Sequence, residues 1–338
     1  MSSIPIGVIG ADRHADELVQ HQAPVPGIIL TEWAPMPDSS DHARVAALAQ
    51  AAGASCASSW QDLIGDSRLG AILVLGEMVS RAGPIAAALR AGKVVLSSFP
   101  ATTTVEALAD LTDAQNDGTG VLTSFGEISD SAAGSHMLRS LRENRLGKVL
   151  SIYLAARMAR GDGNGQSVLD EIGWPMLDFL LSCATSPVVR MHTAGGRVMA
   201  DGEHHDTAVV LIRFADDLVA TLELSRCLPP SIAVAQAGEI EIEAIGAREV
   251  IRLLPQNAAV RVFADTGPSL RPWTEAPLLA SLARLVGTVR DRIRDDALFK
   301  RTRSAIALMD EIRSRLVDSK AQHGPAAGIR AQSDATSE

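Results

Sequence analysis

The segment 71–100 constrains the fold of this 338-residue chain more than any other part of the sequence. An apolar run, Ala71–Leu75, ends at a glycine, and an Ala- and Leu-rich stretch with helical periodicity, Arg81–Ala91, follows it. A second apolar run, Val94–Leu96, comes soon after another glycine. Strand, helix and strand in this order form a βαβ unit, in which the two strands lie parallel. The sequence therefore predicts a parallel sheet in this region.

The same alternation of short apolar strands and helices extends over the whole N-terminal part of the chain. This pattern is typical of an open parallel sheet of the Rossmann type, and we assign residues 1–122 to a Rossmann-like dinucleotide-binding domain. Further strands are expected at Ile4–Ile9, Gly27–Glu32 and Val121–Phe125, and further helices up to about Gln20 and at Asp41–Ala52, Gln61–Ile64 and Thr104–Asn116.

After Phe125 the strands follow one another with few helices between them, which indicates an open, mainly antiparallel sheet. We assign residues 123–318 to a C-terminal substrate and oligomerisation domain, and residues 319–338, which lack apolar periodicity, to a disordered tail. The predicted fold class is thus α/β, with an N-terminal Rossmann-like parallel sheet and a C-terminal α/β domain. Its strands are expected at Val149–Ala156, Val188–Gly195, Ala208–Phe214, Leu218–Ser225, Glu239–Ala244 and Glu249–Leu254, and its helices at Ser131–Asn144, Val168–Ser182, Leu278–Ile293 and Asp295–Leu316.

Charge and cysteine usage argue against several classes of protein. The formal net charge is −9 and the basic residues form no long run, so a nucleic acid is not an expected partner. No apolar run reaches the ~20 residues that span a bilayer, and the N-terminus lacks the pattern of a signal peptide, so we expect no membrane association and no secretion. Three widely spaced cysteines favour free thiols over a disulfide or a metal site, which predicts a cytoplasmic protein.

Four segments carry a resemblance to a known family. They are the βαβ unit with its final Ser-Phe-Pro, the loop Asn144–Lys148 (NRLGK), the strand Asp206–Phe214 (DTAVVLIRF) and the helix Asp296–Leu316. In order and spacing they resemble the glucose–fructose oxidoreductase/inositol dehydrogenase (Gfo/Idh/MocA) family over nearly the whole chain. The resemblance implies an NAD(P)-dependent oxidoreductase that acts on a sugar, a polyol or a similar small molecule, and an oligomer formed through the C-terminal sheet.

The resemblance also locates two proton-transfer groups, and this sequence replaces both. The family's Glu-Lys-Pro triplet, whose lysine lies beside the nicotinamide, reads Ser-Phe-Pro, so Phe99 stands where the lysine is expected. The family's helical motif Asp-x-x-x-His-x-x-Asp starts at Glu171 and has Pro175 in place of the histidine. Glu171 is the remaining candidate base, a role that needs a raised pKa. Asp178, which ends the motif, is a second catalytic candidate or a structural carboxylate.

A dinucleotide site is expected at the turn after the first strand. A G-x-G-x-x-G turn lets the backbone approach a pyrophosphate at the N-terminus of the next helix. Here Asp12 replaces the second glycine, and its carboxylate either repels the phosphates or turns away and caps the helix. Glu32, at the end of the second strand, suits a ribose diol and favours NAD(H) over NADP(H). The predicted cofactor-binding residues are Gly10, Ala11, Asp12, Arg13, Glu32 and Gly76.

Two functions stay open at this point. The chain is a divergent NAD(P)-dependent oxidoreductase with weak or lost activity, or it is a non-catalytic pseudoenzyme that serves as a ligand-binding regulator or as the partner of an active homologue. A small-molecule ligand is an expected partner. We also expect a homo-oligomer, or a pair with a homologue, formed through the alternating apolar strands of the C-terminal sheet.

Overall fold

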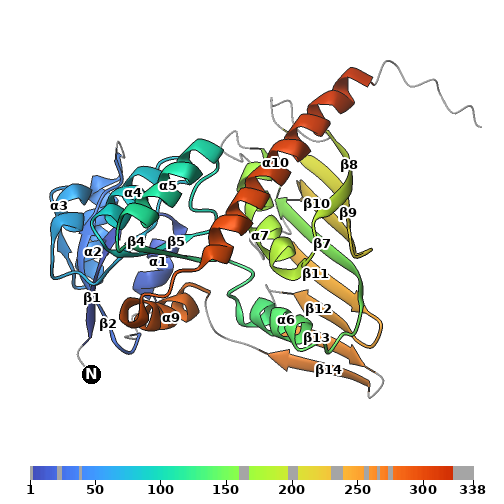
Figure 1. Ribbon diagram of the computed structural model, residues 1–338, viewed down its shortest axis with the longest axis horizontal. Helices are drawn as coiled ribbons and strands as arrows, with labels where there is room; N and C mark the ends of the chain where they lie inside the picture. Colours follow the sequence, from blue (N-terminus) through green and yellow to red (C-terminus); the bar gives the residue numbers. More distant parts are fainter. Residues whose placement is uncertain are drawn as a thin grey trace, which may run out of the picture.

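The computed structural model describes residues 3–20, 25–37, 40–159, 167–196, 205–229, 239–254, 259–264, 267–272 and 277–322. The chain forms an N-terminal layered domain and a C-terminal domain with one large sheet, and a long helix runs from the first toward the far end of the second (Figure 1). Among the described helices, none is both long and apolar enough to cross a membrane.

The N-terminal sheet has six strands in the order β3-β2-β1-β4-β5-β6, and every pair is parallel. The predicted Rossmann-like sheet is therefore confirmed. The sequence reading missed only the two-residue strand β3. The strands are β1 (Ile4–Ile9), β2 (Ile28–Ala34), β3 (Ser55–Cys56), β4 (Ala71–Val74), β5 (Val94–Ser98) and β6 (Val121–Phe125).

Helices cover both faces of this sheet. Apolar side chains of α3, α4 and α5 pack on one face, and those of α1, α2 and the late helix α9 pack on the other. Polar side chains set some of the starting points: the Thr104 hydroxyl accepts a hydrogen bond from the amide of Ala107, at the first turn of α5. The helices are α1 (Arg13–Gln20), α2 (His42–Ala51), α3 (Trp60–Gly65), α4 (Ala82–Arg90), α5 (Val105–Asp117) and α9 (Pro277–Asp291).

The C-terminal sheet has eight strands in the order β14-β13-β12-β11-β7-β10-β9-β8, and all neighbours are antiparallel except β7 and β10. The predicted mainly antiparallel sheet is confirmed. Two strands, β13 and β14, were not predicted. Strand β14 contains two prolines, which are unfavourable inside a sheet. The strands are β7 (Val149–Ala159), β8 (Val188–Gly196), β9 (Thr207–Phe214), β10 (Val219–Leu228), β11 (Glu239–Gly246), β12 (Val250–Leu254), β13 (Ala259–Ala264) and β14 (Gly267–Pro272).

The described helices cover one face of this sheet, and the other face, called the open face below, carries none of them. Helices α6 (Ala132–Arg142), α7 (Trp174–Cys183) and α10 (Asp296–Gln322) lie over one face (Figure 1). Strand β9 shows the result, because its residues alternate between buried and exposed along the strand. The apolar core beneath these helices is continuous with the core under α3, α4 and α5. The two domains are therefore packed together around a shared interior.

The structure also refines three predicted boundaries. The proposed division at 122/123 falls inside β6, and we place it after Phe125. The predicted helix Val168–Ser182 consists of a π-helical turn, Leu169–Gly173, followed by α7, because Pro175 lacks the amide hydrogen that a regular helix needs there. Helix α10 reaches Gln322, so the first residues of the predicted tail are helical, and residues 323–338 lie outside the described part of the chain.

Candidate functional site

A cavity of about 610 Å³, called the central cavity below, lies where the two domains meet. Its floor is formed at the carboxyl ends of parallel strands, the usual position of ligand sites in open α/β sheets. Residues after β1, β4, β5 and β6 line it from the N-terminal domain, and residues of the π turn, α7 and α10 from the C-terminal domain. The lining residues include Asp12, Arg13, His14, Glu77, Arg81, Ser98, Phe99, Thr103, Glu127, Asp170, Glu171, Trp174, Pro175 and Arg313.

A second cavity of about 1020 Å³, called the loop cavity below, adjoins the first along the β1–α1 turn. The two share Asp12, Arg13, Gly76 and Glu77. Of the predicted cofactor residues, five line the loop cavity: Gly10, Ala11, Asp12, Arg13 and Gly76. The structure thus brings these five residues together at one concave surface, and their role in cofactor binding stays a prediction.

Gly10 and Gly76 hold two loops close together at this surface. Gly10 has a φ of +95°, and a Cβ atom on it would collide with the carbonyl oxygen of Leu75. A Cβ atom on Gly76 would lie 2.8 Å from Cγ of Met36. The indole nitrogen of Trp33 donates a 2.7 Å hydrogen bond to the carbonyl of Gly10 and so stabilises the turn between β1 and α1. No larger residue fits at Gly10 without a shift of the backbone.

Asp12 occupies the N-terminus of α1. Its Oδ1 accepts a 2.9 Å hydrogen bond from the backbone amide of His14, so the carboxylate caps the helix. Burial raises the pKa of this carboxyl. The amide that a pyrophosphate oxygen would use is therefore already bound, and a fixed acidic group lies in the phosphate position. The turn as it stands does not fit a dinucleotide bound in the usual way.

Glu32, the predicted ribose-binding acid, lies away from both cavities. Its Oε1 accepts a 2.9 Å hydrogen bond from Nη2 of Arg68. Strand β2 continues to Ala34, and the residues that reach the loop cavity come after it, at Met36 and Pro37. The sequence-based reason for favouring NAD(H) over NADP(H) is thus removed.

His14, Arg13 and Glu127 form a charged cluster at the wall of the central cavity. His14 is 8% exposed, and its ring nitrogens lie 3.4 Å from carboxylate oxygens of Glu17 and Glu127. Burial lowers the pKa of His14, but the two carboxylates outweigh this effect and raise it to about 9. Arg13 makes an ion pair with Glu127, and these cations hold the pKa of Glu127 at about 2 against the opposite effect of burial. All three groups are charged at neutral pH.

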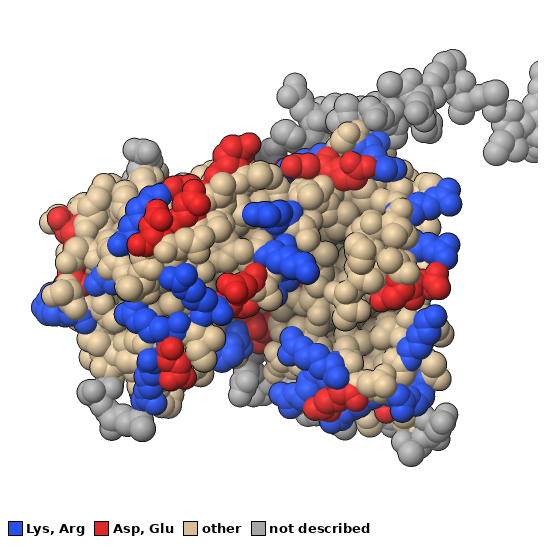
Figure 2. Space-filling model, in the orientation of Figure 1, with Lys and Arg blue, Asp and Glu red and all other residues tan. Residues whose placement is uncertain are grey.

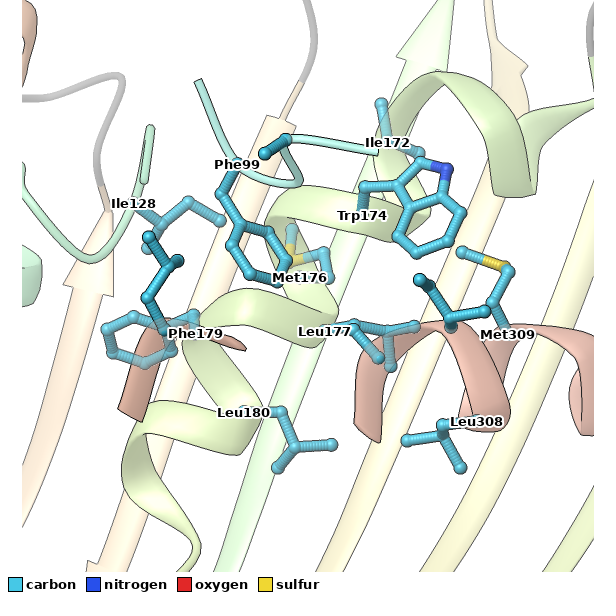
Figure 3. Packing of buried hydrophobic residues seen from close by; sticks show 14 of the residues in the cluster. Phe99, Ile128, Ile172, Trp174, Met176, Leu177, Phe179, Leu180, Leu308 and Met309 are labelled. Atoms are coloured by element: carbon cyan, nitrogen blue, oxygen red, sulfur yellow. The ribbon is translucent and has the colours of Figure 1, made fainter. Parts of the chain in front are cut away.

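Phe99 belongs to an apolar cluster that joins the domains. It is 6% exposed and lies among Ile128, Trp174 and Phe179 at the top of α7 (Figure 3). The guanidinium carbon of Arg301 lies 5.5 Å from the centre of its ring. One side of Phe99 lines the central cavity, together with Pro175. The two positions where the resemblance expects a lysine and a histidine are therefore brought together, and neither carries a group that can transfer a proton.

The carboxylates opposite Phe99 are engaged in ion pairs. Glu171, on the π turn, pairs with Arg226, and the neighbouring Asp170 pairs with Arg313 of α10. The Arg313 guanidinium also lies 5.8 Å from the centre of the Trp174 ring. Glu171 lines the central cavity and keeps about 35% of its side chain exposed. It is the candidate base that the structure leaves accessible.

Asp178 is separated from this cavity. It is 1% exposed, its Oδ2 accepts a 2.6 Å hydrogen bond from Ser129, and its Oδ1 lies 2.9 Å from Nε of Arg301. Burial raises its pKa, and the arginine opposes this effect. The carboxylate thus joins α7 to α10 and to the segment after β6, which matches the structural alternative given for it.

Arg81, His14 and Glu127 were not assigned to the site from the sequence. They follow three different strands, β4, β1 and β6 respectively, so only the tertiary structure brings them to one cavity. The Arg81 guanidinium is buried, donates a hydrogen bond to the Ser98 hydroxyl, and has an Nε without a partner among the described residues. A charged residue shortly after an apolar strand was the signal available for all three, and it is too common to identify a site.

On the face in Figure 2, Lys and Arg alternate with Asp and Glu, and no extended surface of one sign is visible there.

No protein-family model matches the chain, and no curated protein sequence matches it. Many solved structures are similar. Myo-inositol 2-dehydrogenase from Lactobacillus plantarum is 14% identical with a TM-score of 0.77, over 94% of this chain and 98% of that one. Levoglucosan dehydrogenase, in complex with NADH and L-sorbose, is 14% identical with a TM-score of 0.78 over the same shares. GenD2 from gentamicin A biosynthesis, in complex with NAD, is 18% identical with a TM-score of 0.76, over 94% and 95%.

At these identities the similarity establishes the fold, and it extends over both domains. The resemblance predicted from the sequence is confirmed at that level: the chain has the two-domain fold of the Gfo/Idh/MocA-type oxidoreductases.

Proposed function

We propose that the protein is a divergent, oxidoreductase-fold protein that binds a small polar molecule in the central cavity and has little or no alcohol dehydrogenase activity. The observation that carries the proposal is the lining of this cavity. It is concave, has a volume of about 610 Å³, and contains several charged groups, which suits a ligand of the size of a sugar. At the position expected to hold the proton-transfer lysine it presents Phe99.

Hydride transfer from an alcohol needs a base for the hydroxyl proton, and such help contributes typically 10²–10⁴-fold to the rate. Phe99 and Pro175 supply none. The dinucleotide turn adds a second obstacle, because Asp12 caps α1 where the pyrophosphate would bind. Both departures affect the same reaction from different sides of the cleft, which supports lost activity more strongly than either does alone.

The test combines turnover with cofactor titration. We expect no oxidation of inositol, glucose or glucitol at ordinary rates of about 10 s⁻¹ with NAD or NADP. Calorimetric titration is expected to give weak binding of both NADH and NADPH. Turnover at that rate, or sub-micromolar binding of either dinucleotide by the wild type, contradicts the proposal. The variants Phe99→Lys and Pro175→His test whether the missing groups alone prevent the reaction.

A second candidate is a slow NAD(P)-dependent oxidoreductase that uses Glu171 as its base. The observation in its favour is that Glu171 lines the central cavity and is accessible, although Arg226 holds its carboxylate. Under this hypothesis Glu171→Gln abolishes a measurable slow oxidation, whereas Glu143→Gln, on the surface, leaves it unchanged. No slow oxidation above that of a buffer blank, or the same rate in both variants, removes this candidate.

We also propose that the chain forms a homo-oligomer, or pairs with a homologue, through the open face of the C-terminal sheet. The exposed Val209 and Leu211 on β9 support this proposal. The three cysteines are free thiols, which fits the further proposal of a reducing, cytoplasmic compartment.

A further inference from the structure

Arg81 differs from the other arginines that line the central cavity. Arg13 pairs with Glu127, Arg313 pairs with Asp170, and Glu171 pairs with Arg226. Arg81 makes no ion pair with a described residue, and its one printed hydrogen bond goes to Ser98, which is uncharged. The charge of this guanidinium is thus left without a carboxylate beside it.

The burial of Arg81 makes this unusual. Arg81 is 2% exposed, and its Nε is buried without a hydrogen-bond partner among the described residues. An arginine rarely lies in the interior unless it is paired, because leaving a buried charge without a partner costs several kcal/mol. Burial lowers the pKa of Arg81 to about 10, which still leaves it cationic at neutral pH. The side chain therefore has an unused donor and a full positive charge.

The surroundings direct this charge toward the cavity. Arg81 lines it together with Ser98 and Thr103, whose hydroxyl groups can bond polar atoms of a ligand. Asp12 and Glu127 attract the guanidinium from a distance, but neither makes an ion pair with it. Hydrogen bonding to Ser98 engages Nη1, and no described residue accepts a hydrogen bond from the buried Nε. An arginine guanidinium binds a carboxylate through charge-assisted hydrogen bonds.

We propose that the central cavity binds a small hydroxy acid, whose carboxylate pairs with the guanidinium of Arg81. This inference rests on the proposed function, ligand binding in the central cavity, and specifies the chemical class of the ligand. The hydroxyl groups of the ligand meet the polar part of the lining, and its carboxylate neutralises the buried guanidinium of Arg81, which makes no ion pair with a described residue. Neutral polyols of the same length lack this interaction and bind more weakly.

Matched pairs of compounds test the proposal directly. The probes are D-glycerate, D-gluconate and D-glucuronate, with glycerol, D-glucitol and D-glucose as neutral counterparts and inorganic phosphate as a simple anion. Binding is measured by calorimetry and by the shift in melting temperature of the full chain. We expect at least one acid to bind roughly 10- to 100-fold more tightly than its neutral counterpart, the factor that a hydrogen-bonded charge provides. Phosphate binding without acid binding assigns the site to a simple anion and overturns the proposal.

Variants of Arg81 connect the binding to this side chain. Arg81→Gln removes the charge and is expected to abolish the preference for the acid, and Arg81→Lys keeps the charge but loses the paired geometry. Arg90→Gln is the matched control, because Arg90 is an exposed arginine at the end of α4, the helix that Arg81 precedes. If Arg81→Gln fails to fold, Ser98→Ala replaces it: freeing the guanidinium is expected to weaken acid binding several-fold.

The outcomes separate the two proposals. Equal binding of acids and neutral compounds, unchanged in Arg81→Gln or Ser98→Ala, overturns the role of Arg81 and leaves ligand binding in place. Failure of all compounds to bind overturns both proposals. Rapid alcohol oxidation by the wild type contradicts the proposed function, and the comparison of acid and neutral probes still decides the role of Arg81.

Discussion

At the scale of single residues, Phe99 packs in the apolar core at the position where the resemblance expects a proton-transfer lysine. Its ring closes the apolar cluster between the domains and contacts the central cavity with one side only. Truncation to alanine removes this packing, and we expect Phe99→Ala to lower the free energy of unfolding by about 3–5 kcal/mol, as measured in urea. Val79→Ala, at a position that is 80% exposed, is expected to change it by less than about 0.5 kcal/mol. Equal stability of the two variants means that Phe99 is not part of the core.

His14 gives a pH dependence at the same scale. Its pKa rises from 6.5 to about 9 on folding, so the folded state binds this proton more tightly than the unfolded chain. The resulting stabilisation is complete below pH 6.5 and is lost as the pH rises through about 9. We expect the free energy of unfolding to fall by up to about 3 kcal/mol across this window. The variant His14→Gln is expected to show a flatter profile, and identical profiles rule out this source of stability.

At the scale of elements, the N-terminus of α1 shows how one side chain changes the use of a motif. The carboxylate of Asp12 accepts the hydrogen bond from the His14 amide that a bound phosphate would otherwise accept. Asp12→Gly removes the acidic group and frees the His14 amide, so NADH is expected to bind at least about tenfold more tightly in calorimetric titration. Asp110→Asn, at an exposed position on α5 that lines neither cavity, serves as the control and is expected to bind like the wild type. If Asp12→Gly does not tighten binding, the carboxylate is not what excludes the phosphates.

At the scale of the whole molecule, none of the described helices covers the open face of the C-terminal sheet (Figure 1). Leu211, Thr221 and Tyr153 lie opposite one another on β9, β10 and β7, and Leu211 is 44% exposed. The Tyr153 hydroxyl and the Arg157 guanidinium both donate hydrogen bonds to the carboxylate of Glu223. The open face therefore carries polar as well as apolar side chains. An uncovered face of this kind favours association between copies.

We therefore expect a dimer in light scattering at micromolar concentration, and a monomer for the variant that carries both Val209→Glu and Leu211→Glu. Circular dichroism checks that the double variant is folded. Val79→Glu, beside the central cavity, is expected to remain dimeric. A monomeric wild type contradicts the proposed interface.

The sequence by itself determined the fold class, because the periodicity of apolar residues is a local property. The βαβ unit at 71–100 and the alternating strand 207–214 required no knowledge of their neighbours. It also identified the turn at Gly10, where only glycine fits, and the replacement of two proton-transfer groups by Phe99 and Pro175.

The tertiary structure decided what the site contains. Whether Asp12 faces a ligand or caps its helix depends on the position of the His14 amide, and whether Asp178 is accessible depends on Arg301, far along the chain. The ion pair of Glu32 with Arg68 could not be predicted for the same reason, because Arg68 comes from another loop. Arg81 is the clearest case. It makes no ion pair with a described residue, and which carboxylates lie near it is decided only when distant segments of the chain pack together.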